Sequence, residues 1–341
     1  MSLIQEARSL METAYDWHRQ GQAVALLTLV AVRGSAYRRP GAKMVMASNG
    51  RMRGTLSGGC LEGDLFLHAE KAMISDEPMV AHYDLTEDEM WGLGIGCKGQ
   101  VDIWIEPMDL DEPFWSAWRE ALQRDQVMVW GGQLPQGLRY FAAQNQTWTE
   151  RQGRAVTLNA HDLQALGSTG SEEGYWWDVL RPPDRLVLAG AGHDARPVAR
   201  LAQQVGFEVV ILDPREAFNT DEHFPNAQHV VRSAPDVDPD SVKESFWVIM
   251  NHHQRRDEEA LKLASLSRPK FVGVLGPRSR TDEMIEHSGV AADQIPLHSP
   301  VGLDVGAEGP EEVAVSIVSE LMAARKNLTG GPLHGQERIH R

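Results

Sequence analysis

The sequence predicts an α/β protein: an N-terminal α+β domain, followed by a C-terminal parallel sheet with helices on both faces. Two observations carry this prediction. Beyond residue 184, four apolar runs alternate with helical stretches, as in a parallel sheet covered by helices. Before residue 107, short apolar strands are joined mainly by turns. A chain of 341 residues is long enough for two domains with well-formed cores.

The N-terminal part combines one amphipathic helix with several short strands. Residues 1–17 have helical apolar spacing, and the run at 23–32 is typical of a buried strand. Asn49-Gly50 is a hairpin signal, so strands are expected on both sides of it. The remaining expected elements are strands over 44–48, 54–59, 80–85 and 100–107 and a helix over 62–73.

The middle of the chain is less regular, and a proline pair marks its end. Six tryptophans crowd between residues 111 and 180, which favours a packing role for this stretch. The two prolines of "RPPD" at 181–184 interrupt regular structure and predict a linker. The sequence therefore predicts an α+β domain over 1–107, a connecting subdomain over 108–180, the parallel-sheet domain over 181–329 and a tail over 330–341.

Composition restricts the classes of partner. The chain carries 33 basic and 48 acidic residues, a net charge of −15, which argues against nucleic acid as a partner because phosphate backbones require clustered cations. The longest apolar run has ten residues, about half a membrane span. The first residues lack the features of a secretory signal, and two cysteines make no disulfide framework. We expect a cytoplasmic protein with no membrane partner.

A glycine turn follows the first apolar run of the C-terminal part. In "VLAGAGHDARPVARLAQQVGFEVVILD", Gly190 and Gly192 end a strand, His193 follows, and a helix begins near Asp194. Asp213 ends the next strand about 20 residues further on, where Rossmann folds carry a ribose-binding acid. These features predict a Rossmann-like nucleotide site; the alternative is a Rossmann-like scaffold that binds no nucleotide. The alternative for Asp213 is that it only caps the turn in "DPRE".

Polar residues follow the next two apolar runs. His252 comes after the run at 246–251, and Arg278 comes after the run at 270–276. Open α/β sheets bind ligands at the carboxyl ends of their strands. We expect His252 to donate a hydrogen bond to a ligand and Arg278 to contact phosphate, although Arg278 could also be a solvated surface residue. Asp257 is expected to cap the helix that follows.

Both cysteines lie in glycine-flanked loops, Cys60 in "GTLSGGCLEGDL" and Cys97 in "GIGCKGQ". Such loops let a ligand approach the backbone closely. Glu62 follows Cys60 and could cap a helix or orient a ligand. Cations are frequent in the loop before it: Arg33, Arg38, Arg39 and Lys43. Thiolates near cations or a helix N-terminus are reactive and bind soft metals; the alternative for Cys60 is a small buried apolar side chain.

Long motifs at both ends of the chain resemble those of the XdhC/CoxI family. They are "GSAYRRPGAKMVM", "GTLSGGCLEGDL", "GCKGQVDIWIEP", "LVLAGAGHDARPVARLA", "VVILDPREAF", "HFPNA" and "SPVGLDVGAEGPEEVAVSIVSEL". The resemblance covers about residues 20–107 and 183–325 in the order of the family. It implies an accessory factor of molybdenum hydroxylases such as xanthine dehydrogenase, aldehyde oxidoreductase or carbon monoxide dehydrogenase, more a maturation chaperone than a turnover enzyme.

The resemblance also implies ligands, partners and site residues. The cofactor would be the molybdenum cofactor, as molybdopterin or its dinucleotide form. The partners would be the apo hydroxylase and a cysteine desulfurase that supplies sulfur, and the protein would be a homodimer. Cys60 and Cys97 would relay sulfur or contact molybdenum. The first site would comprise Gly34, Ser35, Arg39, Ser57, Gly58, Gly59, Cys60, Glu62 and Cys97, with Gly190, Gly192, His193, Asp213, His252 and Arg278 on the nucleotide side.

Two other functions remain open from the residues alone. The turn at Gly190 and Gly192 would also suit an NAD(P)-dependent oxidoreductase, although the sequence contains no recognisable hydride-transfer site with a catalytic acid or base. The acidic surface would suit a protein adaptor that joins client and desulfurase without contacting the cofactor. In that case the glycine-flanked thiols would have no purpose.

Overall fold

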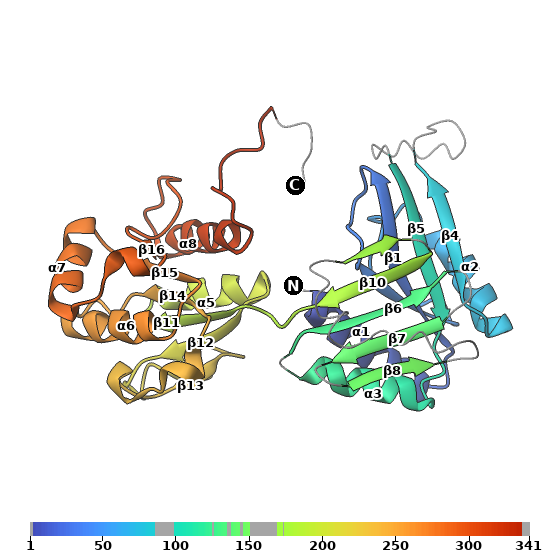
Figure 1. Ribbon diagram of the computed structural model, residues 1–341, viewed down its shortest axis with the longest axis horizontal. Coiled ribbons are helices and arrows are strands. Elements are labelled where there is room, and N and C mark those ends of the chain that lie inside the picture. The colour runs from blue at the N-terminus through green and yellow to red at the C-terminus, as the bar shows by residue number, and fades with distance from the viewer. Residues whose placement is uncertain are drawn as a thin grey trace. The chain divides into compact units, whose positions relative to one another are not determined.

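A computed structural model describes residues 3–85, 99–124, 126–134, 138–143, 146–150, 169–172 and 174–335. The chain divides into two compact units, an N-terminal unit of residues 2–182 and a C-terminal unit of residues 183–341 (Figure 1). Each unit has hydrophobic cores of its own. None of the helices in the described part of the chain combines the length and apolar character that a membrane span requires.

The first sheet of the N-terminal unit is antiparallel, with strand order β3-β2-β1-β5-β4. Its strands are β1 (Val24–Gly34), β2 (Lys43–Ala47), β3 (Met52–Gly54), β4 (Met79–Asp84) and β5 (Gly99–Pro107). Helix α2 (Glu62–Ser75) covers one face, where its Leu65 and Ala69 pack with Leu27 and Leu29 of β1. The expected hairpin at Asn49-Gly50 is confirmed by the pairing of β2 with β3.

One strand prediction is wrong, and the error lies beside Cys60. A strand is expected over 54–59, but the observed strand β3 spans Met52–Gly54, and residues 55–61 form a loop. Gly54, Gly58 and Gly59 all have positive φ angles, of 94°, 74° and 110°, which a continuous strand does not allow. The glycines therefore turn the chain away from the sheet edge before α2 begins.

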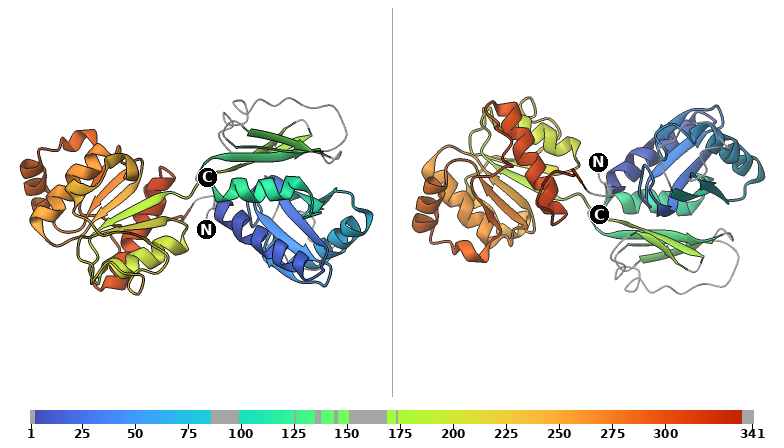
Figure 2. Two further views of the ribbon diagram at one scale, coloured as in Figure 1. Left: turned by 90° about the horizontal axis from the view of Figure 1, so that it is seen from below. Right: turned by 90° about the horizontal axis from the view of Figure 1, so that it is seen from above.

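A second antiparallel sheet completes the N-terminal unit, with strand order β8-β7-β6-β10-β9. Its strands are β6 (Met128–Gln133), β7 (Leu138–Ala143), β8 (Gln146–Glu150), β9 (Gly170–Glu172) and β10 (Tyr175–Leu180). Helices α1 (Leu3–Arg19) and α3 (Pro113–Gln123) share one core with both sheets (Figure 2). The Trp130 ring packs there against Trp118 and Trp176, at centroid distances of 5.1 and 4.8 Å respectively.

A buried ion pair connects the two sheets of this unit. Lys43 of β2 contacts Asp178 of β10, and both side chains are at most 1% exposed. The Lys43 ammonium also donates to the Gly41 carbonyl at 2.8 Å, and Thr169 donates to Asp178 at 2.7 Å. The expectation that Lys43 contributes a cation near Cys60 is therefore wrong, because its charge is neutralised inside the core.

The C-terminal unit contains a parallel six-stranded sheet of order β13-β12-β11-β14-β15-β16. The strands are β11 (Arg185–Ala189), β12 (Glu208–Leu212), β13 (Gln228–Val230), β14 (Phe246–Ile249), β15 (Phe271–Val274) and β16 (Leu297–His298). The α-helices are α5 (Ala195–Gln204), α6 (Gln254–Leu266), α7 (Arg278–Ser288) and α8 (Pro310–Arg325). Short 3₁₀ helices are η1 (Ala234–Asp236), η2 (Pro239–Val242) and η3 (Ala292–Gln294).

This strand order confirms the Rossmann-like prediction and identifies the ligand edge of the sheet. Helices α5 and α8 pack on one face, and α6 and α7 pack on the other. Strands β11 and β14 are adjacent, yet the helices that follow them cover opposite faces. Doubly wound sheets bind ligands in the crevice at the carboxyl ends of two such strands. That edge carries the glycine turn after β11 and Asn251 and His252 after β14.

Candidate functional site

The glycine loop before α2 is held by a single carboxylate, that of Glu62. One carboxylate oxygen accepts hydrogen bonds from the Thr55 hydroxyl at 3.0 Å and from the backbone N–H groups of Leu56 and Ser57 at 3.3 and 3.2 Å. The other oxygen accepts from the Ser57 hydroxyl and from the backbone N–H of Gly59 at 3.0 Å. Glu62 therefore anchors residues 55–59 to the start of α2, and its oxygens are occupied within the loop.

The ionisation of Glu62 follows from these bonds. Partial burial opposes the charge, but hydrogen bonds from Ser57 and Thr55 outweigh it and lower the pKa of Glu62 to about 2. The carboxylate is thus charged at neutral pH. The sequence left open whether Glu62 caps a helix or orients a ligand; the geometry shows it organising the loop.

Cys60 is exposed at the end of this loop, directly before the N-cap residue Leu61 of α2. A pocket adjoins it, with Tyr37, Leu56, Leu61 and Ile103 among the lining residues. Its other lining residues are Leu29, Ala36, Ser57, Leu85 and Val101. The lining is mostly apolar, so the structure places an exposed thiol at the rim of an apolar pocket. The interpretation of Cys60 as a buried apolar side chain is wrong.

The basic loop before β2 contacts the glycine loop, but its charges are largely paired. Arg38 binds the carboxylate of Glu6 at 2.9 Å and donates to the Thr55 carbonyl at 3.3 Å. Arg33 pairs with Asp102 at 3.1 Å. Arg39 is exposed and also has an interaction partner. Arg38 consequently supports the loop that carries Cys60, rather than offering a free charge there.

The remaining residues predicted for the first site lie at the sheet end beside this pocket. Gly34 ends β1 opposite Gly99 of β5, and Ser35 follows it. A Cβ on Gly99 would lie 2.5 Å from the Ser35 carbonyl oxygen, so these two segments require a glycine at their closest approach. Cys97 lies outside the described residues, and its part in the site stays a prediction.

The second predicted group lies on the C-terminal unit, at the turn after β11. Gly190 has a φ of 123°, and a Cβ there would lie 2.6 Å from the Met250 carbonyl oxygen beyond β14. Gly192 is close to the Asp194 carboxylate, since a Cβ on it would lie 2.7 Å from Asp194 Oδ1. His193 is exposed between them. The two glycines are therefore explained by close approaches within this unit.

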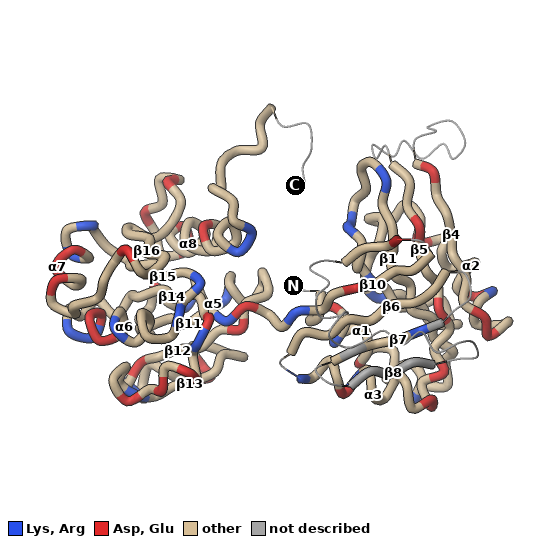
Figure 3. Tube along the Cα trace, in the orientation of Figure 1, with Lys and Arg blue, Asp and Glu red and all other residues tan. Residues whose placement is uncertain are grey.

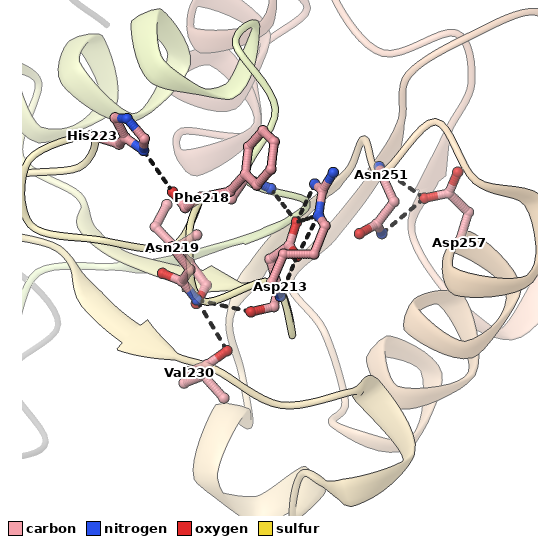
Figure 4. A network of polar contacts seen from close by, with 10 residues as sticks. Asp213, Phe218, Asn219, His223, Val230, Asn251 and Asp257 are labelled. Atoms are coloured by element: carbon pink, nitrogen blue, oxygen red, sulfur yellow. Dashed lines mark hydrogen bonds and ion pairs between the residues drawn. The ribbon is translucent and has the colours of Figure 1, made fainter.

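Asp213 is occupied by its own neighbours (Figure 4). Its oxygens accept from the Ala191 N–H at 2.8 Å and from the backbone N–H and Nε of Arg215, both at 2.9 Å. Burial opposes the charge, but these hydrogen bonds, those from Arg215 first, lower the pKa of Asp213. The carboxylate is fully buried. This geometry matches the turn-capping alternative for Asp213 and also connects the turn to the end of β12.

Asp194 and His252 form a pair that sequence reasoning missed. His252, which follows β14 with a φ of 55°, lies 2.6 Å from Asp194 Oδ2 through its Nε2. Asp194 is the N-cap residue of α5, although its side chain makes no capping hydrogen bond. His252, expected to donate to a ligand, instead contacts a carboxylate of the chain. The sequence feature that could have indicated this pair is the acid directly after the Gly-x-Gly-His segment, Asp194.

The prediction that Asp257 caps α6 is wrong. His253 is the N-cap residue, and Asp257 lies buried inside the helix. Its carboxylate accepts from the backbone N–H and the side-chain amide of Asn251, both at 3.0 Å, and pairs with Arg280. Asp257 therefore fixes the loop that follows β14, as Figure 4 shows for Asn251.

Arg278 begins α7 after β15, where it pairs with Asp282 at 2.8 Å. Both side chains are more than half exposed, which fits the alternative of a solvated arginine. Within the described ranges, no group of three His, Cys, Asp or Glu side chains is placed to hold a metal ion. A thiol contact to molybdenum at Cys60 stays a prediction.

Comparison with known proteins identifies the family. The XdhC and CoxI family matches residues 17–84, which include the Cys60 loop, and the XdhC Rossmann domain matches residues 186–321. The chain is 31% identical over 321 residues to a probable xanthine dehydrogenase component of Bacillus subtilis, covering 91% of this chain and 95% of that protein. It is 24% identical over 329 residues to the molybdenum cofactor insertion chaperone PaoD of Escherichia coli, covering 95% and 90%.

The similarity extends to the fold. A crystal structure of a xanthine dehydrogenase from Bacillus halodurans is 29% identical and superposes with a TM-score of 0.79, covering 96% of each chain. Together with the two family matches, this confirms the resemblance inferred from the motifs. The chain belongs to the XdhC and CoxI family.

Proposed function

We propose that this protein binds the molybdenum cofactor and delivers it to a molybdenum hydroxylase of the xanthine dehydrogenase, aldehyde oxidoreductase or carbon monoxide dehydrogenase type. Family membership and the full-length similarity to the insertion chaperone PaoD support an accessory role in cofactor maturation. The proposal includes sulfuration of the cofactor with sulfur from a cysteine desulfurase, and a cytoplasmic homodimer as the working state.

The observation that carries this proposal is the clamped loop that presents Cys60. Glu62 uses both carboxylate oxygens to hold residues 55–59, so the exposed thiol extends from a fixed backbone beside an apolar pocket. Molybdenum and its terminal sulfur are soft partners for a thiolate. The apolar lining, with Tyr37 at its rim, suits the flat ring system of a pterin.

The NAD(P)-dependent alternative receives support only from the strand order. At the glycine turn, the Asp194 carboxylate lies beside Gly192 and the first turn of α5, where a pyrophosphate would need unopposed N–H groups. Asp213 has its oxygens occupied by Ala191 and Arg215. These contacts favour the maturation role over an oxidoreductase that uses this turn.

Cofactor retention tests the proposal. The protein is co-expressed with its hydroxylase, purified, and analysed for molybdenum and extractable pterin. We expect bound cofactor in the wild type, and at least about tenfold less in Cys60→Ser, because a lost metal–thiolate contact costs more than about 1.4 kcal/mol. Glu62→Gln should also lose cofactor, since it weakens the bonds that position Cys60.

Two further variants show whether a loss of cofactor comes from the Cys60 loop. Glu70→Gln, on the exposed side of α2, removes the same charge without touching the loop and should retain cofactor. Cys97→Ser separates the contributions of the two thiols. Full cofactor binding and full client activation by both cysteine variants would contradict the thiol assignment, while client binding that never depends on cofactor would favour the adaptor alternative.

A further inference from the structure

The surface around α8 concentrates exposed apolar side chains. Of the eleven large apolar side chains that are exposed in the described part of the chain, five lie between residues 305 and 333: Val305, Val315, Met322, Leu328 and Leu333. Single apolar residues are ordinary on a protein surface, whereas a concentration on one helix and its flanks is typical of an interaction surface. Such a surface is therefore expected on α8, which packs on a face of the sheet and not at its ligand edge.

Helix α8 has one buried face and one exposed stripe. Ala314, Ile317 and Leu321 are fully buried in the core that α8 shares with α5. Val315 and Met322, about two helical turns apart, are 52% and 46% exposed, and the helical period places them on a common side of the helix. Neither side chain belongs to a core of the C-terminal unit, so their apolar surface is open to water or to a partner.

The segments before and after α8 border this stripe without covering it. The Ser316 hydroxyl donates to the Leu303 carbonyl at 2.6 Å, which holds the preceding segment along one side of the helix. The N–H of Leu328 donates to the Ala323 carbonyl at 2.9 Å, which turns the following segment back toward the same side. Both segments thus lie beside the stripe, and its apolar side chains stay about half exposed.

The two ends of the stripe carry opposite charges. Glu311 lies in the first turn of α8 and Lys326 is its C-cap residue, and both are exposed. Figure 3 shows the basic positions at the end of this helix. Within the described ranges, neither side chain has a hydrogen-bond or ion-pair partner. They cannot pair with each other, because about 22 Å of helix separates them.

These positions complement a second copy of the same helix. Val315 lies as far before the midpoint of the stripe as Met322 lies after it, and Glu311 and Lys326 are related in the same way. A two-fold axis at that midpoint aligns α8 antiparallel with its counterpart. Val315 then meets Met322 of the second copy, and Glu311 meets Lys326 of the second copy. Each contact forms twice, as a two-fold interface requires, and the small Ser319 beside the axis allows the helices to approach closely.

Helix α2 also exposes two apolar side chains, Leu67 at 61% and Ile74 at 81%, but the charges at its ends do not complement a second copy. An antiparallel pairing that places Leu67 against Ile74 of the second copy would place Asp64 against Glu77, two acids. Like charges that face each other across an interface oppose association. The charge pattern therefore favours α8 over α2 as a surface for self-association.

We propose that α8 is the self-association surface of this protein and forms an antiparallel helix pair with a second copy, across a two-fold axis near Ser319. The inference rests on the homodimer of the proposed function and names the surface that forms it. Each chain carries a net charge of −15, but physiological salt screens charges beyond about 8 Å, so contacts at short range decide. One helix pair is small beside a standard interface of about 1,600 Å², so we expect a dissociation constant of about 1–50 μM.

Sedimentation velocity of the full-length, molybdenum-free protein tests this surface, at concentrations from about 0.5 to 500 μM that bracket the expected constant. Met322→Ala should raise the dissociation constant at least about tenfold, because the two-fold axis removes the side chain from two contacts. Leu266→Ala, which truncates a 61% exposed leucine of α6, should change it less than about twofold.

Charge reversal tests the orientation of the helix pair. Glu311→Lys and Lys326→Glu should each raise the dissociation constant about five- to tenfold, since each places like charges at both ends of the pair. The double variant exchanges the two charges and should return to within about twofold of the wild type. Such a recovery does not arise from misfolding, and it requires that the two positions meet across the interface.

A disulfide trap locates the axis. In a Cys60→Ser, Cys97→Ser background, Ser319→Cys should form a disulfide between two chains on mild oxidation, because a cysteine beside a two-fold axis meets its own counterpart. The matched control is Ser265→Cys, at a partly exposed serine of α6, which should give no product of doubled mass.

The assignment is overturned if the protein stays monomeric over the whole concentration range. It is equally overturned if the Met322 and charge-reversal variants dimerise like the wild type, which would keep the homodimer but exclude α8 as its interface. These outcomes are distinct from failure of the proposed function. Loss of cofactor with an intact α8 dimer would contradict only cofactor binding, and full cofactor retention and client activation by a monomer would contradict only self-association.

Discussion

Glu62 holds the backbone of the Cys60 loop with a single carboxylate. Three backbone N–H groups and two hydroxyl groups converge on it, so its charged form is favoured despite partial burial. The consequence is a loop with a defined shape at neutral pH. A glycine-rich segment without such an anchor would lose more conformational entropy whenever a ligand ordered it.

This anchor predicts a specific pH dependence of stability. The pKa of Glu62 falls from 4.5 in its unperturbed state to about 2 in the folded protein. A lowered folded-state pKa stabilises the fold above about pH 4.5, and that contribution is lost as the pH falls toward 2. For this partly exposed group we expect about 1–2 kcal/mol at pH 7 after allowance for solvent screening.

Urea unfolding of the wild type and Glu62→Gln at pH 7, 5, 4 and 3 measures this contribution. The difference in unfolding free energy should be constant above pH 5 and shrink at pH 4 and 3. Glu70→Gln should show no such trend, because Glu70 lies exposed on the same helix. A difference that stays constant down to pH 3 would rule out a lowered pKa at Glu62.

At the scale of elements, the turn after β11 is shaped by its neighbour β14. Gly190 and Gly276 both follow parallel strands, and both have a φ of 123°. A Cβ on Gly190 would lie 2.6 Å from the Met250 carbonyl oxygen, whereas a Cβ on Gly276 would meet only the Arg280 side chain, at 3.5 Å. Substitutions at the two glycines therefore distinguish the cost of backbone strain, which both share, from the cost of overlap with a neighbouring segment, which only Gly190 has.

We expect Gly276→Ala to cost about 1–2 kcal/mol of unfolding free energy, because alanine at this φ is strained. Gly190→Ala should cost about 1–3 kcal/mol more, because the added methyl group also overlaps backbone atoms after β14. Denaturant unfolding of both variants measures the difference. Equal costs would show that the turn relaxes away from β14 without penalty.

At the scale of the whole molecule, the two units have separate cores. Leu65 of α2 belongs to a core of the N-terminal unit, and Leu261 of α6 belongs to a core of the C-terminal unit. Both side chains are fully buried. A cavity in one core therefore removes packing from that unit without touching the apolar contacts of the other.

Calorimetry of Leu65→Ala and Leu261→Ala tests this independence. Each cavity should cost about 2–5 kcal/mol and should lower a different one of two unfolding transitions. Leu67→Ala and Leu266→Ala, on the same helices with side chains 61% exposed, should leave both transitions nearly unchanged. A single transition lowered equally by both cavity variants would show that the units unfold together.

The local spacing of apolar residues in the sequence was sufficient to predict much of this architecture. The apolar runs that became β1, β11, β12, β14 and β15 and the helices α1, α2 and α8 were predictable because burial of a continuous face has a strong sequence period. The family was predictable from long motifs at both ends of the chain. The strand after the Asn49-Gly50 turn was placed too far along the chain, because the hydrogen bonds by which Glu62 holds residues 55–59 have no local sequence period.

The sequence by itself determined the fold class and the family, since periodicity, glycine turns and motif order are properties of neighbouring positions. The apolar pocket beside Cys60 was not predicted, because strands distant in the chain contribute most of its lining. Only the tertiary structure decided which charges are free. Lys43 is paired with Asp178 and Arg38 with Glu6, and Asp194 lies 2.6 Å from His252 Nε2, while Arg232 and Arg256 line a pocket without a partner among the described residues. Ion pairing depends on distances of a few ångströms between residues far apart in the chain, which no sequence spacing encodes.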